Sequence, residues 1–542
     1  MEVSSEGPSR RPGGESPTSR KPILLPGIVG LAGALLLFVE LRHGVPRAND
    51  FADHAGTTVQ VLNAFRDGVF YPRWMPDFHA GLGEPTLNFY PPGLYLVSAL
   101  LAWLLGGDVL AGLFATLFLL AVAGGIGMFV FLRRPQGTGA AVIGGLAFGI
   151  LPYRFFEIYC AGLYSAFCAA CLLPWALHLL GRIASLEERG RFGVCLAWAA
   201  VYAAIVFTNL PTAVLLAYFS LFYFLLELIA GRAPRRLLGI PAGGLWGIGL
   251  AALYLLPAVL ELRWLQAFPG AGLNLYRSNF LFQFAGSWMG PGLRKMFAGM
   301  AIFPALALVI SLAAIAAARR RHSAPEDPEM PWVRLVALVG LLSLFLATPV
   351  SSWLWSVLPY LKEVNLPWRL LEPLGTAAVA ASAAAWVLLR RRRSSRVLSG
   401  SLATFLLLLA AVCVSFDLSL SRVNGRAAWA ETEAALPTFA RKTPQGLFLL
   451  KGARPPAEFS NVPLVACGSP CRVAIRAWLP SHREIWVDAP GGTALALRTY
   501  FFPGWTARRA DGRQEPFPVG AEAGTGRLVV RLPEGESHVL IK

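Results

Sequence analysis

Long apolar runs separated by short polar segments make up most of the chain. Runs of roughly 20 residues, the length that crosses the hydrocarbon core of a bilayer, recur between Ile23 and Phe416. This pattern predicts an all-α polytopic membrane protein with about eleven spanning helices. The expected spans are approximately 23–39, 109–132, 138–153, 164–181, 193–209, 211–230, 238–257, 297–318, 333–350, 371–389 and 399–418.

One apolar stretch, Gly93 to Leu105, is too short to span. It lies between Pro91-Pro92 and Gly106-Gly107. If it crossed the bilayer, every later arginine cluster would fall outside, against the tendency of basic loops to remain in the cytoplasm. We therefore expect an interfacial or re-entrant helix here. With the N-terminus inside, the loop 40–108 then lies outside the cytoplasm.

The pattern changes after Thr443, where short segments alternate between apolar and polar residues. Turn residues separate them, which predicts a small antiparallel β domain of sandwich type outside the cytoplasm. The expected strands are Cys471–Trp478, Glu484–Asp488, Thr493–Tyr500, Gly526–Leu532 and His538–Ile541. The aromatic stretch from Tyr500 to Trp505 fits either a sugar platform or the sandwich core. Cys467 and Cys471 are close enough in this tail for a disulfide.

The predicted organisation has four parts. It comprises a disordered cytoplasmic tail at 1–22, a transmembrane domain at 23–418 with its first outer loop at 40–108, a linker at 419–442, and the β domain at 443–542.

Composition supports a membrane protein and argues against a nucleic-acid partner. Of the 542 residues, 55% are hydrophobic and 15% are charged, whereas soluble domains carry about 25% charged residues. The net charge of +17 comes largely from short clusters between apolar runs, such as Arg390 to Arg393. Such clusters indicate topology and contact with anionic lipid headgroups rather than a nucleic-acid surface.

The first outer loop is the richest in functional side chains. Apolar positions predict a helix from Asp53 to Asp67, with Asp50 at its start and His54 one turn further on. Asp50 could simply cap this helix. Alternatively, its carboxylate could take the proton from an acceptor hydroxyl, with His54 assisting. Other candidates in this loop are Asp53, Arg73, Trp74, Glu84 and Tyr90.

The later outer loops contribute a second set of charges. The charged candidates are Glu157, Glu261, Arg263, Lys362 and Arg369, joined by the aromatic Trp368, and Arg154 is a further charge in these loops. Cations on the outer side run against the usual charge bias, and a bound lipid phosphate or pyrophosphate would explain them. The sequence has no G-x-x-x-x-G-K-[ST] loop and no H-E-x-x-H motif. A pre-activated, lipid-linked donor therefore fits better than ATP.

Several motifs, in order, resemble a known family. They include Gly68-Val69-Phe70-Tyr71-Pro72-Arg73-Trp74, Gly81-Leu82-Gly83-Glu84-Pro85, Phe89-Tyr90-Pro91-Pro92, Asn209-Leu210-Pro211-Thr212 and Leu366-Pro367-Trp368-Arg369-Leu370. With Asp50 and His54, they resemble bacterial 6-pyruvoyl-tetrahydropterin synthase-related (YfhO-like) membrane proteins. That family is similar to GT-C type glycosyltransferases that use polyprenyl phosphates. Pterin chemistry is not expected, because the seven histidines are scattered.

The resemblance implies a multi-pass GT-C-like enzyme of the bacterial cytoplasmic (inner) membrane. Such an enzyme would transfer a sugar, with inversion, from a polyprenyl phosphate to an envelope lipid, glycan or protein acceptor outside the cytoplasm. Asp50 would be the base, supported by His54 and Asp53. Arg263, Lys362 and Arg369 would contact the donor phosphate, and Glu157 would be a second acidic position. Asp50 and Glu157 together would be the candidates for a divalent metal, Mg or Mn.

The remaining candidates, Arg73, Trp74, Glu84, Tyr90, Glu261 and Trp368, would bind substrate. Two alternatives belong to other classes. A lipid or glycan transporter (flippase) would place ionisable residues and broken helices within the spans. A non-catalytic envelope scaffold would act through its β domain alone.

Overall fold

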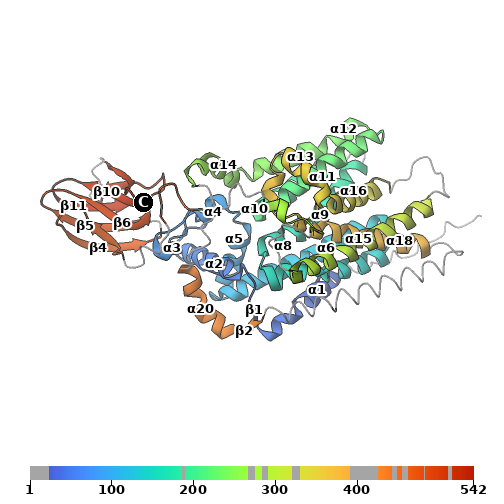
Figure 1. Cartoon of the computed structure of the whole chain (residues 1–542), viewed down its shortest axis with the longest axis horizontal. Helices are drawn as coiled ribbons and strands as arrows, with labels where there is room; N and C mark the ends of the chain where they lie inside the picture. Colours follow the sequence, from blue (N-terminus) through green and yellow to red (C-terminus); the bar gives the residue numbers. More distant parts are fainter. Residues whose placement is uncertain are drawn as a thin grey trace, which may run out of the picture.

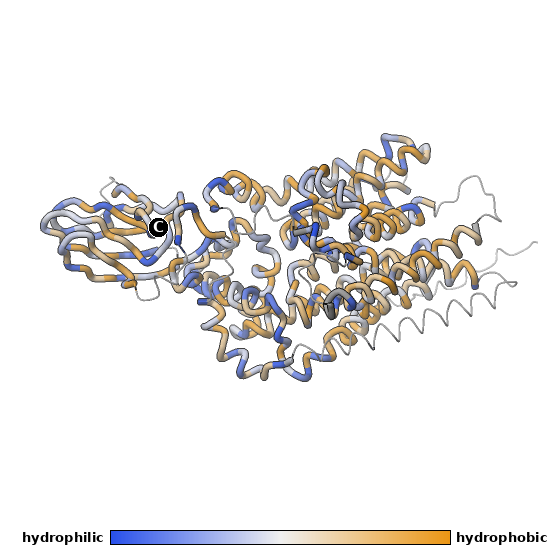
Figure 2. The backbone as a smooth tube through the Cα atoms, in the orientation of Figure 1, coloured by the Kyte–Doolittle hydropathy of each residue, from blue (hydrophilic) through white to orange (hydrophobic). Residues whose placement is uncertain are grey.

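The computed structural model consists of a long helical part and a β domain at its far end (Figure 1). It describes residues 24–185, 190–266, 275–283, 291–319, 330–390, 415, 425–441, 448–454, 462–480, 482–510 and 516–542. Hydrophobic residues dominate the helical part, whereas hydrophilic and hydrophobic residues alternate in the β domain (Figure 2). Both the all-α membrane domain and the C-terminal β domain are confirmed.

Within the described ranges, seven helices are long and apolar enough to span a membrane, or up to nine if each of two bent pairs is one span. The main helices are α1 Leu25–Phe38, α6 Val109–Gly149, α8 Tyr164–Cys171, α9 Leu173–Ser185, α10 Arg191–Thr208, α11 Leu210–Ile229, α15 Pro291–Arg319 and α18 Leu371–Arg390. The bent pairs join α13 Gly239–Leu250 to α14 Ala252–Glu261 and α16 Met330–Leu346 to α17 Ser352–Val357. The expected span at 399–418 lies outside the described residues.

Helix α6 is a hairpin of two packed halves. Gly137 interrupts the helix with φ 85° and ψ 174°, a backbone conformation that suits glycine. Gly125 and Gly145, one from each half, lie against each other, because a Cβ added to Gly145 would be 3.1 Å from the Gly125 carbonyl oxygen. This close approach lets the helices pack tightly, as small residues do in membrane bundles. The two expected spans at 109–132 and 138–153 correspond to these halves.

Short helices build the first loop and the connections between spans. In the first loop they are α2 Phe51–Arg66, α3 Phe78–Gly81, α4 Thr86–Phe89 and α5 Gly93–Leu104, preceded by η1 Val39–His43. Elsewhere they are α7 Pro152–Phe155, η2 Phe156–Ala161, α12 Pro234–Leu237, η3 Leu262–Trp264, η4 Leu275–Ser278, η5 Pro349–Ser351, η6 Leu361–Val364 and η7 Pro367–Leu370. Helix α5 has 12 residues, too few to cross a bilayer.

The segment after the last spans is not the plain linker that we expected at 419–442. Residues 426–427 form strand β2, which pairs with β1, Val45–Pro46. Helix α20, Trp429–Arg441, follows and packs on α2. The Gln60 amide donates to the Ala440 carbonyl at 3.1 Å, and a Cβ on Gly56 would lie 2.4 Å from the Phe439 carbonyl. Segments nearly 400 residues apart thus form one unit around α2.

The C-terminal domain is a sandwich of two antiparallel sheets. One sheet has the order β3-β6-β10-β9 and the other β4-β5-β11-β7-β8. Their strands are β3 Val465–Cys467, β4 Arg472–Leu479, β5 His482–Ala489, β6 Thr493–Tyr500, β7 Ala507–Arg509, β8 Pro516–Phe517, β9 Val519–Ala521, β10 Arg527–Leu532 and β11 Gly535–Ile541. Buried residues of both sheets form one core. Cys467 and Cys471 form a disulfide.

The β domain is docked on the first loop. The Tyr500 amide donates to the Leu82 carbonyl at 2.7 Å, and the Arg498 Nε donates to the Ala80 carbonyl at 3.0 Å. The Trp74 ring meets the Trp505 ring edge-on at 5.7 Å. Much of the Tyr500–Trp505 stretch therefore has a packing role, and the β domain lies on the same side of the helical part as loop 40–108.

Candidate active site

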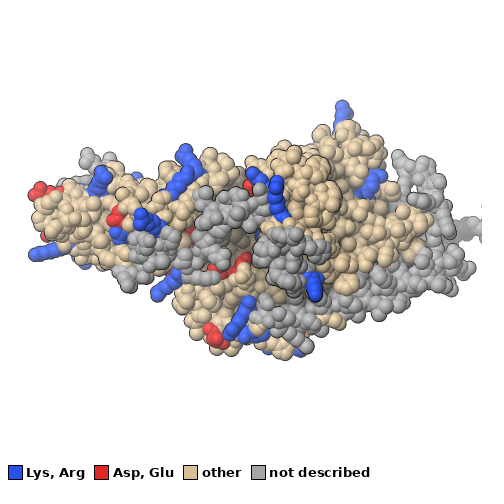
Figure 3. Space-filling model, viewed as in Figure 1, with Lys and Arg blue, Asp and Glu red and all other residues tan. Residues whose placement is uncertain are grey.

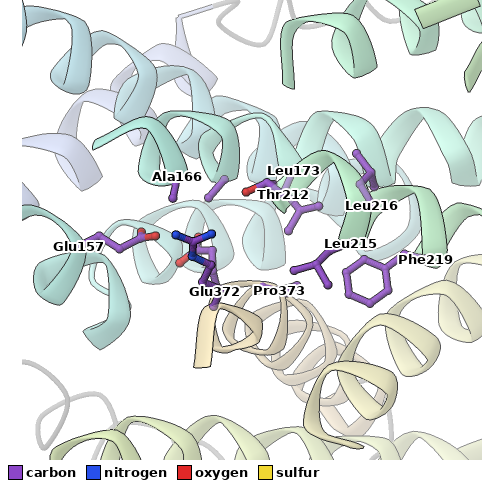
Figure 4. A pocket seen from close by; sticks show the side chains of 11 residues that line it. Glu157, Ala166, Leu173, Thr212, Leu215, Leu216, Phe219, Glu372 and Pro373 are labelled. Carbon is purple, nitrogen blue, oxygen red and sulfur yellow. The ribbon is translucent and has the colours of Figure 1, made fainter. Parts of the chain in front are cut away.

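A narrow cavity opens among η2, α8, α11 and the start of α18. The space in it that a water-sized sphere can enter is about 20 Å³, so a larger ligand would have to widen it. Its polar residues are Glu157, Thr212, Arg369 and Glu372, and its apolar walls are Ala166, Ala170, Leu173, Leu215, Leu216, Phe219 and Pro373. The Glu157 and Glu372 side chains point toward one part of the cavity, while Leu215, Leu216 and Phe219 line another (Figure 4). The cavity thus has a charged part and an apolar part.

A buried ion pair stabilises the charged part of the cavity. The Arg154 guanidinium, fully buried on α7, donates through Nε and Nη2 to the Glu372 Oε1 at 2.9 and 2.6 Å. The same guanidinium lies 3.6 Å from the centre of the Phe148 ring. A buried charge needs such a partner, because its desolvation is costly. The pair fixes α18 against α7 and accounts for one carboxylate of the cavity.

Glu157 and Arg369 form fewer hydrogen bonds with described residues than the Arg154–Glu372 pair does. Glu157 is 2% exposed, and its Oε2 has no hydrogen-bond partner among the described residues. Arg369 donates only a long bond, 3.4 Å from Nη1 to the Val364 carbonyl, and its Nε has no partner in the described part of the chain. Ionisable groups buried in a membrane domain are rare and mark functional sites. A donor as strong as the Arg369 Nε is suited to an anionic ligand.

Tyr90 connects this cavity to Asp50. Its hydroxyl donates to the Ser165 Oγ at 3.4 Å, and Ser165 precedes the cavity residue Ala166. Burial raises the pKa of Tyr90, and the nearby Arg369 guanidinium and Asp50 carboxylate shift that pKa in opposite directions. Both charges therefore act on the same hydroxyl. The sequence separates Asp50 from Arg369, but the fold brings both close enough to Tyr90 to influence its hydroxyl.

Asp50 sits at the start of α2 without capping the helix. Its side chain makes no capping hydrogen bond, and its Oδ1 instead accepts from the Asn49 Nδ2 at 2.6 Å. The Asp50 amide donates to the Ala161 carbonyl at 3.1 Å. The capping role that we considered is thus absent. The predicted helix is present, with Asp53 in its first turn.

His54 is a buried neutral group. It is 4% exposed, its Nδ1 lies 2.9 Å from the Tyr95 hydroxyl, and its ring stacks on Tyr164 at 5.2 Å. Burial lowers the pKa of His54 to about 4, and a hydrogen bond with the Gly162 backbone opposes this shift. The imidazole is therefore uncharged at neutral pH. Its contacts favour an orienting role for the residues around Asp50.

Four other candidates from the sequence lie away from the cavity. Glu84 is buried and bonded to the His79 Nε2 at 2.6 Å, and Trp74 packs on the β domain. Arg73 lies 5.5 Å from the Tyr71 ring. Glu261 accepts from the Asn88 Nδ2 at 2.7 Å. These contacts position the first loop rather than enclose the cavity.

The three candidates Arg263, Lys362 and Trp368 differ in their surroundings. Arg263 is exposed beside the Trp264 ring. Lys362 is exposed with its Nζ 4.0 Å from the Glu363 carboxylate. Trp368 is buried and stacks on Phe297 at 5.0 Å. None of the three lines the cavity, and only Arg369 of the predicted phosphate contacts does.

The expected metal position gains no support from geometry. Among the described residues, no group of three or more His, Cys, Asp or Glu side chains is arranged to hold a metal ion. Asp50 and Glu157 do not form such a group, so no step below uses a metal.

The two residues of the buried pair were not among the sequence candidates. Arg154 was noted only as an outer-loop charge, and Glu372 lies in an apolar segment. The sequence feature that could have identified Glu372 is its position: it is a lone acid at the start of an apolar span, three residues after Arg369.

The family comparison matches residues 87–424 to the 6-pyruvoyl-tetrahydropterin synthase related domain, a membrane protein family. No curated protein matches the chain.

Among solved structures, the chain is similar to the oligosaccharyltransferase AglB of Archaeoglobus fulgidus in complex with an inhibitory peptide and a dolichol-phosphate. The identity is 12%, 78% of this chain and 60% of that chain are covered, and the TM-score is 0.49. It is also similar to ArnT of Cupriavidus metallidurans bound to undecaprenyl phosphate, with 16% identity, coverage of 77% and 78%, and a TM-score of 0.46. The chain therefore spans about three fifths of the length of the archaeal enzyme.

Proposed function

Because the chain belongs to the family of 6-pyruvoyl-tetrahydropterin synthase-related membrane proteins, we propose that its cavity serves a membrane glycosyltransferase. The donor is a sugar on a polyprenyl phosphate, and the acceptor is an envelope lipid, glycan or protein outside the cytoplasm. The observation that carries the proposal is the cavity itself. It combines an apolar wall with Arg369, whose Nε has no hydrogen-bond partner among the described residues. Both Arg369 and Asp50 act electrostatically on the nearby Tyr90 hydroxyl.

The cavity residues suit the two ends of such a donor. Leu215, Leu216 and Phe219 offer apolar surface for a prenyl chain, and the Arg369 guanidinium offers hydrogen bonds to a phosphate. Phosphate binding at Arg369 would also bring a partner to its Nε.

In the proposed reaction, Asp50 acts as general base. The Asp50 carboxylate takes the proton from the acceptor hydroxyl, whose oxygen bonds to the anomeric carbon as the bond from that carbon to the phosphate oxygen breaks. Attack from the face opposite the phosphate inverts the configuration. The leaving polyprenyl phosphate stays at Arg369, whose positive charge stabilises it.

Replacing Asp50 by Asn tests the base. Transfer should fall at least about 100-fold, since a positioned base contributes that much or more. Asp67→Asn is the matched control, because Asp67 is exposed at the other end of α2. Mass spectrometry of envelope glycans in cells expressing each variant at equal abundance gives the readout. Unchanged glycans in the Asp50 variant would refute the assignment.

Replacing Arg369 by Gln tests the donor site. We expect polyprenyl phosphate binding, followed by native mass spectrometry of the detergent-purified chain, to weaken about 10-fold or more through loss of charge-assisted hydrogen bonds. Lys362→Gln removes a cation from the same loop but outside the cavity, and it should leave binding unchanged. Equal effects of the two variants would argue against a phosphate site at Arg369.

A transporter is the second candidate, and one observation favours it. The pair α13 and α14 bends by 71° and the pair α16 and α17 by 89°, and broken helices are common in transporters. A transporter would move a lipid-linked sugar in a sealed vesicle without forming a new glycosidic bond. Product analysis of such vesicles therefore separates the two functions.

A further inference from the structure

A second hollow, the η3 groove, lies between η3 and the β domain. It is an open hollow of about 520 Å³, and its lining includes Arg263, Trp264, Lys451, Phe501 and Pro503. Two backbone hydrogen bonds, from Gln266 to Leu449 and from Lys451 to Trp264, each 2.9 Å, tie its two walls together. The groove is therefore a built feature of the fold rather than a gap between separate parts.

Two cations line the groove without a salt bridge to any residue that the structure describes. Arg263 and Lys451 are exposed, and neither forms an ion pair with a described residue. Two described acids that stand close in sequence to lining residues, Glu261 near Arg263 and Glu522 after Ala521, have other hydrogen-bond partners. Glu261 accepts from Asn88 at 2.7 Å, and Glu522 pairs with Arg527 at 2.6 Å. An anionic ligand would meet two available cations here.

Aromatic residues give the groove a second property. Trp264 is 37% exposed and Phe501 is partly buried in the same hollow. Binding sites for small ligands commonly combine such rings with a few charges that set orientation. Phe501 and Pro503 come from the aromatic stretch that we considered as a sugar platform.

Short chain segments connect the groove to the candidate active site. Phe448 contacts the Tyr90 ring at 6.5 Å between ring centres and lies three residues before Lys451. Glu261 holds Asn88, two residues from Tyr90, and precedes Arg263 by two residues. Since each residue spans at most about 3.6 Å, Lys451 lies within about 11 Å of Phe448 along the chain, and Arg263 lies within about 7 Å of Glu261.

We infer that this groove holds the acceptor, and that the acceptor is an anionic saccharide. The two cations receive its acidic groups, the aromatic rings receive the apolar faces of its sugars, and its acceptor hydroxyl extends toward Asp50. The inference rests on the proposed function, because it names the substrate class of that enzyme.

Binding of a defined probe tests the groove. The purified full chain is placed in nanodiscs of neutral phosphatidylcholine and titrated with fluorescent hexagalacturonate and with uncharged maltohexaose. The wild type should bind the acidic hexasaccharide about 10-fold more tightly or better. The double variant Arg263→Gln/Lys451→Gln should lose that preference. The control Arg472→Gln/Arg508→Gln removes two exposed cations from the other sheet and should change affinity less than about 2-fold.

Three results would overturn the inference. They are no preference for the acidic probe in the wild type, an equal loss in the control variant, or replacement of the probe by phosphatidylglycerol in the nanodisc, which would make the groove a lipid headgroup site. Polyprenyl phosphate binding, measured on the same preparations, separates this from the proposed function. A wild type that shows no preference for the acidic probe but still binds polyprenyl phosphate refutes the groove alone, whereas absent donor binding in the wild type refutes the proposed donor.

Discussion

The environment of His54 decides how this residue can act. A histidine exposed to water titrates near pH 6.5, but burial against Tyr95 and Tyr164 lowers the pKa of His54 to about 4. At neutral pH it has no proton to give from an imidazolium. The contacts of His54 with Tyr95 and Tyr164 fit the orienting role proposed for it beside Asp50, the proposed base.

The lowered pKa of His54 predicts acid sensitivity. Because the unfolded chain takes up a proton at His54 near pH 6.5 and the folded chain only near pH 4, stability should fall as pH drops through this window. The shift corresponds to roughly 3 kcal/mol at most. His54→Asn should flatten thermal stability between pH 6.5 and 4 in differential scanning fluorimetry. A variant with the same pH slope as the wild type would contradict this account.

Sequence reasoning found some site residues and missed others for a clear reason. Asp50, Glu157 and Arg369 were visible as charges in loops that should lie on one side of the membrane. Glu372 was not, because its role depends on Arg154, which lies 218 residues away along the chain. No local pattern records that two distant charges form one buried pair.

The Arg154–Glu372 pair gives a prediction at the scale of elements, since it joins α7 to α18. Glu372→Gln should destabilise the helical part by about 3–5 kcal/mol, because it leaves the Arg154 charge buried without its partner. The double variant Arg154→Met/Glu372→Leu should recover much of this loss. Thermal unfolding in detergent measures both. A single variant as stable as the wild type would show that the pair does not hold these helices together.

Elements with strong periodicity were predictable, and those that depend on distant partners were not. The spans, the short helix α5 and the main strands follow from apolar length and alternation. Helix α20 lies in the segment predicted as a linker. Only three of its 13 residues are buried, and α2 defines the face that they form, so the isolated pattern of apolar residues is weak. Gly56 marks that contact, but a lone glycine in a helical pattern does not identify its neighbour.

At the scale of the whole molecule, the contacts fix relative sidedness. The β domain binds the first loop through Leu82 and Ala80, and Lys451, just before its strands, binds η3 through Trp264. On the face shown in Figure 3, Lys and Arg side chains also stand out on the β domain and near it. All of these parts must lie on one side of the membrane.

Cysteine labelling tests this sidedness. Asp67→Cys and Glu536→Cys, both at exposed positions of the joined parts, should react with a membrane-impermeant maleimide in intact cells. Arg236→Cys, exposed in a basic loop, should react only after permeabilisation. The unchanged chain gives the background. Different behaviour of positions 67 and 536 would contradict the docked arrangement.

The pairing of β1 with β2 has a consequence for biosynthesis. Val45 pairs with Ala427, and Asp50 follows β1 by only four residues. A nascent chain therefore completes this strand pair beside Asp50 only after every described span has been synthesised. Growing or truncated chains carry the proposed base without this strand pair, so we expect a chain that ends before Ala427 to be less active than the full chain.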